Sequence, residues 1–77
     1  MNQIELGMRV HCEPNGNMEH AFDGRVVKLY EFSALVAIDD YHHEDALNAR
    51  ELLYRTIISF KKMVPGAFVN RGDEAIG

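Results

Sequence analysis

The fold class is decided by two short stretches, GRVVKL at residues 24–29 and ALVAID at residues 34–39. Side chains of a β-strand point alternately to its two faces, so every second residue shares a face. In the second stretch, one such set consists of Ala34, Val36 and Ile38. The segment between the stretches is short enough for a hairpin loop. Together they predict an antiparallel β-hairpin with one buried face.

Gly24 marks an irregularity inside the first of these strands, which we expect to run over residues 22–30. Glycine weakens a strand unless the backbone bends or approaches a neighbour closely. If Val26 and Leu29 both face the core, strict alternation must slip by one residue between them. We therefore predict that the strand curves at Gly24 and carries a β-bulge near residues 27–28.

Two further strands are predicted before and after the hairpin. Residues 8–12 alternate apolar with polar side chains, and a cluster of turn-forming residues follows at residues 13–17. The β-branched run over residues 56–60 predicts a later strand, although its two successive isoleucines leave the buried face open. The Val-Pro-Gly sequence at residues 64–66 is expected to end this strand.

The segment that precedes the later strand has helical character. Residues 44–53 are rich in good helix formers. Asp40 or Asp45 could cap the helix at its N-terminus. We predict a helix of about two to three turns. Its packing face is expected to consist of Ala46, Arg50 and Leu53, with Leu47 beside them.

The predicted order of elements is strand, strand, strand, helix, strand, which lacks the strand–helix alternation of a parallel sheet. A small antiparallel barrel suits such short strands, because closure removes exposed edges. We therefore predict a mostly β fold, an SH3-like barrel over residues 1–66 with one short helix inserted before the last core strand. Residues 67–77 are expected to form a C-terminal tail, and a further short pairing near Phe68 is left open.

The hairpin of residues 24–29 and 34–39 looks like the hairpin of KOW-type SH3-like barrels. With YRTIISFKKM at residues 54–63, it makes the chain resemble the YkvS-like proteins, small proteins of Gram-positive bacteria, over roughly residues 7–64. This resemblance implies a bacterial SH3-like barrel and assigns no activity and no functional residues. KOW modules in general are associated with RNA, ribosomes and transcription complexes. The chain differs from them in its acidity and in the segment 39–51.

Composition narrows the classes of function. The chain has 77 residues and a formal net charge of −4, which suits one domain with a limited core. A domain that binds nucleic acid mainly by neutralising phosphates is expected to be basic, so the acidic balance disfavours that class. The one cysteine, Cys12, cannot form an intramolecular disulfide. The N-terminus lacks a signal-peptide pattern and no run has the length of a membrane span, so we expect a cytoplasmic protein.

Catalytic or metal chemistry has little support in the sequence. Residues 39–45, DDYHHED, combine imidazoles and carboxylates, which are possible ligands for zinc, nickel or manganese. A metal site needs converging side chains, and the adjacent His42 and His43 are expected to point in different directions. We therefore interpret the segment as a solvated acidic loop and assign no metal site, leaving metal binding by these histidines open. Cys12 is expected to pack as a small hydrophobic residue. Without a catalytic or cofactor motif, we predict neither an enzyme nor a cofactor.

A binding surface is the remaining candidate for function. Cations and aromatic residues along two of the predicted strands could form a basic strip that consists of Arg25, Lys28, Tyr30, Arg55, Phe60, Lys61 and Lys62. Such a strip suits single-stranded nucleic acid, although the same residues also fit ordinary surface charges with core aromatics. The acidic segment 39–51 could instead meet a basic partner. Our leading prediction is a non-enzymatic module that binds a protein or peptide. Binding of RNA or single-stranded nucleic acid is the alternative, and self-association stays open.

Overall fold

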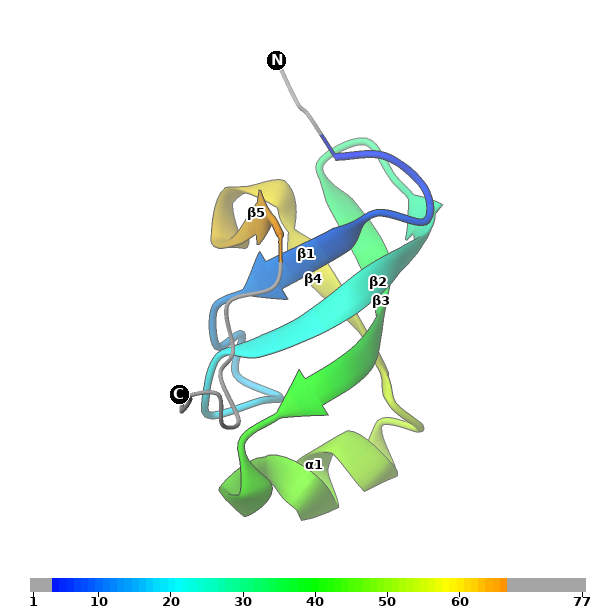
Figure 1. The fold of residues 1–77 in the computed structure, drawn as a ribbon. Coiled ribbons are helices and arrows are strands. Elements are labelled where there is room, and N and C mark those ends of the chain that lie inside the picture. The colour runs from blue at the N-terminus through cyan, green and yellow to red at the C-terminus, as the bar shows by residue number, and fades with distance from the viewer. Residues whose placement is uncertain (1–3, 67–77) are drawn as a thin grey trace.

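Five antiparallel strands form one sheet in the computed structural model, which describes residues 4–66 (Figure 1). In chain order they are β1 (Arg9–Cys12), β2 (Phe22–Leu29), β3 (Ser33–Tyr41), β4 (Arg55–Ser59) and β5 (Met63–Pro65). Their order across the sheet is β4-β3-β2-β1-β5, and the edge strands β4 and β5 do not pair with each other in the described part of the chain. The predicted mostly β, antiparallel fold with one short α-helix is confirmed. Over residues 4–66 the sheet is not closed into a barrel.

The core lies on the inner faces of the strands, as their alternation predicts. In β1, Val10 and Cys12 are fully buried, and in β3 every second side chain from Ala34 to Ile38 is buried. The sequence left open which isoleucine of β4 faces the core. It is Ile58, which is 1% exposed, whereas Ile57 is 56% exposed. Ile57 therefore points away from the core.

The register of β2 against β3 confirms the predicted bulge. Val26 pairs with Val36 while Lys28 pairs with Leu35, which leaves Val27 as the extra residue. A second register shift lies beside Gly24. A Cβ atom at this position would overlap the side chain of Val36 and the carbonyl oxygen of Ala37. Gly24 is thus required by the close approach of β3, one of the two reasons for which a strand tolerates glycine.

The helical segment consists of a short 3₁₀ helix, η1 (His43–Asp45), and α1 (Ala46–Glu51). The predicted packing face was wrong: Leu47 is 63% exposed and Leu53 is 79% exposed, whereas Ala49 is buried and Leu52 packs against the core. The predicted and the observed packing faces are offset by one position along the helix. The helix adopts the second face because the small Ala49 packs against the core.

No helix in the described residues is long and apolar enough to cross a membrane.

A left-handed turn joins α1 to β4. Leu53 and Tyr54 both have positive φ, 57° and 61°, a conformation that is uncommon for residues other than glycine. The Tyr54 N–H donates to Ala49 O, and Tyr54 O accepts a hydrogen bond from the Ile38 N–H at 2.7 Å. These bonds hold the turn and direct the chain back along β3. The sequence carries no glycine here that would have predicted it.

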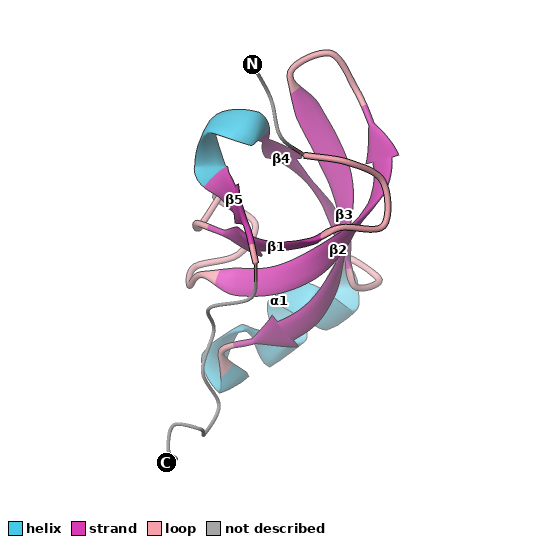
Figure 2. Ribbon diagram, turned by 45° about the horizontal axis from the view of Figure 1, so that its top comes forward, coloured by secondary structure: helices cyan, strands magenta, loops and turns pink. Residues whose placement is uncertain are grey.

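A fifth strand, which the sequence did not predict, follows β4. After β4 a 3₁₀ helix, η2 (Phe60–Lys62), leads into β5, which pairs antiparallel with β1 through Val10 and Pro65 (Figure 2). Residues 64–66 were expected to end the strand of residues 56–60, but that strand already ends at Ser59, and Val64 and Pro65 belong to β5. Proline is tolerated because β5 lies at the edge of the sheet. The predicted pairing near Phe68 and the tail 67–77 lie outside the described residues.

The β1–β2 loop, residues 13–21, closes over one end of the core. Met18 from this loop is fully buried. The Asn15 side chain donates a hydrogen bond of 3.1 Å to Thr56 Oγ1 on β4, and its Oδ1 accepts from the Met18 N–H. The loop is therefore held against a strand that is distant in the chain.

Replacing Gly24 by alanine tests the close approach. We expect Gly24→Ala to lower the free energy of unfolding by about 1–3 kcal/mol, because the added methyl group meets a backbone carbonyl that cannot move independently of β3. Val27→Ala, on the exposed bulge of the same strand, should change stability by less than about 0.5 kcal/mol. Urea denaturation measures both. Equal effects of the two substitutions would contradict the packing described for Gly24.

The burial of Cys12 can be tested through the pH dependence of the free energy of unfolding. Burial, and secondarily the charge of Asp23, raise the pKa of the Cys12 thiol from 9.0 to about 12. Between these two pH values the unfolded chain has lost the thiol proton while the folded chain keeps it. The thiol's contribution to stability is therefore complete below pH 9 and is lost as pH rises toward 12, by at most about 1.4 kcal/mol per pH unit.

The measurement is urea denaturation of the protein and of Cys12→Ala at about pH 8 and about pH 10. The protein should lose about 1 kcal/mol more than the variant over this interval. Both chains share all other titrating groups, so the difference isolates Cys12. The same pH dependence in both would show that the thiol is not protected by folding.

Candidate functional site

The outer face of β2, β3 and β4 carries a row of basic residues. Arg25 of β2 pairs with Ala37 of β3, and Ala37 pairs in turn with Arg55 of β4. Paired residues point to the same face of a sheet. With neighbouring strands about 4.8 Å apart, the two arginines lie roughly 10 Å from each other across a small residue. Their alignment follows from register and could not be read from the sequence.

The neighbouring row is partly apolar. Lys28 pairs with Leu35, and Leu35 pairs with Ile57. The bulged Val27 is 44% exposed beside them. The Lys28 ammonium lies 5.5 Å from the centroid of the Tyr30 ring, a cation–π distance. The outer face comprises Arg25, Val27, Lys28, Tyr30, Leu35, Ala37, Arg55 and Ile57.

In the described part of the chain, carboxylates do not neutralise the cations of the outer face. Within residues 4–66, no ion pair involves Arg25, Lys28 or Arg55. Arg9, which pairs with Arg25 across β1 and β2, is instead 3.6 Å from the Asp40 carboxylate. The Arg25 guanidinium donates a hydrogen bond of 3.3 Å to the Gly7 carbonyl oxygen. The remaining donors of these cations are available to an anionic partner.

The structure divides the basic strip that the sequence suggests. Four of its residues belong to the outer face: Arg25, Lys28, Tyr30 and Arg55. The other three form η2, beyond the end of β4. There Phe60 packs against the core, and the Lys62 ammonium donates to the Pro14 carbonyl oxygen of the β1–β2 loop at 3.2 Å. Lys61 is exposed on the same short helix.

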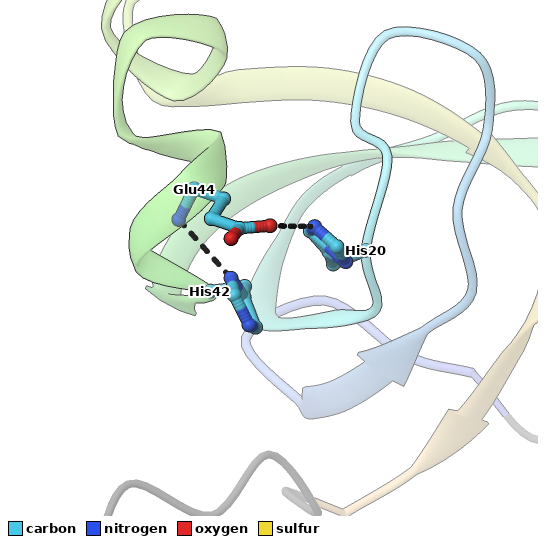
Figure 3. A group of neighbouring side chains, drawn as sticks. All are labelled: His20, His42 and Glu44. Atoms are coloured by element: carbon cyan, nitrogen blue, oxygen red, sulfur yellow. Dashed lines mark hydrogen bonds and ion pairs between the residues drawn. The ribbon is translucent and has the colours of Figure 1, made fainter.

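A histidine cluster lies where the β1–β2 loop meets η1 (Figure 3). The rings of His20 and His42 stack with centroids 4.1 Å apart, and those of His42 and His43 stack at 4.4 Å. The expectation that His42 and His43 point in different directions was wrong, because the chain passes from extended backbone at His42 into the 3₁₀ helix. His20 Nε2 lies 3.2 Å from Glu44 Oε1.

Asp45 holds the loop of this cluster in place. Its fully buried carboxylate accepts hydrogen bonds from the Glu19 N–H (3.1 Å), the His20 N–H (2.8 Å) and the Asn48 side chain (2.9 Å). Burial alone would raise the pKa of Asp45, but these bonds outweigh it and lower the pKa below its usual value. Asp45 lies at the N-cap position of α1, as predicted, but its side chain makes no capping hydrogen bond there.

The residue that does cap the helical segment is His42. Its Nδ1 accepts a hydrogen bond of 3.0 Å from the Glu44 N–H. The other predicted cap, Asp40, lies in β3, and its carboxylate forms an ion pair with Arg9. The sequence held one signal for the cluster, the concentration of histidines and acids at residues 39–45. The contribution of His20 could not be found without the loop geometry.

No family model matches the sequence, and neither the curated proteins nor the solved structures give a match. The resemblance to the YkvS-like proteins therefore stays a prediction.

Proposed function

We propose that this protein is a non-enzymatic binding module whose outer face binds a protein or peptide segment carrying carboxylates beside apolar side chains. The observation that carries the proposal is the paired arrangement of Arg25 and Arg55 next to the exposed Ile57. Guanidinium groups bind carboxylates in a bidentate manner, and their fixed spacing would select the spacing of acids in the partner.

We further propose that the sheet is an open SH3-like barrel. The strand order β4-β3-β2-β1-β5 supports this, since each strand follows its chain neighbour except for β5, which returns to β1. The long β2, shared by β1 and β3, and the 3₁₀ turn η2 between β4 and β5 support it as well. A fold by itself does not define a ligand, so the function is argued from the outer face.

The apolar part of the outer face favours a protein over a nucleic acid. Ile57 and Val27 are exposed on either side of the half-buried Leu35. Burial of such aliphatic groups stabilises a protein complex by about 25 cal/mol per Å² of apolar surface. A single-stranded nucleic acid instead needs aromatic rings for base stacking. Within the outer face the one aromatic ring, that of Tyr30, already contacts Lys28.

Single-stranded RNA is the second candidate, and the same arginine pair favours it. Arg25, Arg55 and Lys28 lack carboxylate partners in the described part of the chain, so they could contact phosphates. The two candidates differ in what Ile57 contributes. An aliphatic side chain adds to a protein interface but offers no ring for a base to stack on.

The test is an NMR titration of the ¹⁵N-labelled full chain with two probes, a synthetic peptide of alternating acidic and aliphatic residues and a short mixed-sequence RNA. We expect the peptide to shift the amide signals of Arg25, Leu35, Arg55 and Ile57. Arg25→Glu with Arg55→Glu should weaken peptide binding at least about tenfold. Ile57→Ser should weaken it about fivefold through lost apolar contact, while the fold persists because the side chain is exposed.

The matched control is Lys61→Glu with Lys62→Glu, which makes the same change of net charge on η2. Its effect on peptide binding should stay below about threefold. An equal loss in both double variants would show unspecific attraction and contradict the proposed face. RNA binding that is steeply weakened by salt and unaffected by Ile57→Ser, without peptide binding, would favour the second candidate.

A further inference from the structure

We propose that His20, His42 and Glu44 form a binding site for a divalent transition-metal ion of the zinc type. The ion would join the β1–β2 loop to the start of the helical segment. This inference is independent of the outer face. It rests on three potential ligands that come from two separate segments of the chain and point toward one another (Figure 3).

The distances suit a zinc ion. One potential ligand atom from each of the three residues lies within 4.8 Å of the others. Tetrahedral zinc with bonds of about 2.0–2.1 Å places its ligand atoms roughly 3.3 Å apart. His20 Nε2 and Glu44 Oε1 already lie 3.2 Å apart. Ligation therefore requires the ligand atoms to approach one another by at most about 1.5 Å.

The donor set selects the class of metal. Two imidazoles and one carboxylate suit zinc and its neighbours in the first transition series, whereas magnesium and calcium prefer oxygen ligands alone. The Glu44 side chain is 65% exposed and that of His20 35% exposed. The ion would therefore face solvent, and its fourth position would be open to water or to a ligand from a partner.

The loop that supplies His20 is held in place without a metal. The buried Asp45 carboxylate accepts the backbone N–H groups of both Glu19 and His20. Asp45 directly follows Glu44, so the same short segment fixes two of the three ligands relative to each other. Glu19, His20 and Asp45 form a second group with ligand spacing. Both carboxylate oxygens of Asp45 are already occupied by hydrogen bonds, which favours the group that contains Glu44.

Metal binding at His42 would break the hydrogen bond that its ring accepts from the Glu44 amide. His42 Nδ1 accepts the Glu44 N–H, so the neutral ring carries its proton on Nε2. A metal bound at Nδ1 would take the lone pair that accepts this bond. A metal bound at Nε2 would move the proton to Nδ1, which could then no longer accept. In both cases the Glu44 amide loses its acceptor, although this amide is not itself a ligand.

The thiol of Cys12 does not compete for the ion in the folded chain. It is fully buried, and burial raises its pKa to about 12, so it stays protonated near neutral pH. Zinc binds the thiolate form of cysteine. A bound ion in the folded protein can therefore be attributed to histidine and carboxylate ligands.

The test is a titration of the ¹⁵N-labelled full chain, freed of any polyhistidine tag, with Zn²⁺, followed by NMR and by isothermal calorimetry. We expect saturation at one ion per chain, with a large shift of the Glu44 amide signal. The thermal midpoint should rise with Zn²⁺ and return to its original value when EDTA is added. His20→Ala and Glu44→Gln should each weaken binding at least about tenfold.

The matched control is His43→Ala, which removes an exposed imidazole that stacks on His42 but lies outside the ligand group. Its affinity for Zn²⁺ should stay within about twofold of the unmodified chain. Absence of saturable binding would overturn the proposal. So would binding that persists in His20→Ala, or binding that leaves the Glu44 amide signal unmoved. All three substitutions are at solvent-accessible side chains, so the NMR spectrum itself reports whether each variant is folded.

Discussion

The close approach of β3 to the backbone of β2 at Gly24 is the constraint on which the rest of the structure depends. β2 pairs with β1 on one side and with β3 on the other, so it joins both halves of the sheet. Because no side chain stands at Gly24, Val36 and the Ala37 carbonyl can lie against its backbone. The register that results places Arg25 opposite Ala37, and through Ala37 opposite Arg55. A contact inside the sheet thus determines the arrangement of charges outside it.

A second constraint is polar and acts between the β1–β2 loop and the helical segment. Asp45 is a buried carboxylate whose hydrogen bonds connect the β1–β2 loop to the helical segment. A buried carboxylate is destabilising unless its hydrogen-bonding capacity is satisfied. Here two backbone N–H groups and one side-chain amide satisfy it. The same bonds bring His20 beside His42, so a structural requirement of the fold also assembles the histidine cluster.

The separation of charges along the chain reappears in space. The acids concentrated in residues 39–51 lie on the helical segment and the end of β3, while the outer face presents arginine and lysine side chains. In Figure 1, α1 lies at the end of the sheet where β3 finishes, away from η2. A net charge of −4 therefore describes neither surface.

The sequence by itself determined strands β1 to β4, the buried faces of β1 and β3 and the bulge at Val27, because alternation of apolar side chains is a local property with a fixed period. It did not determine which face of α1 packs, since two rotations of a short helix are both compatible with its residues. The left-handed turn at Leu53 and Tyr54, and strand β5, depend on hydrogen bonds to distant strands. The tertiary structure alone decided which arginines share a row and which histidine joins Glu44, because strand register and loop contacts join residues that are far apart in the chain.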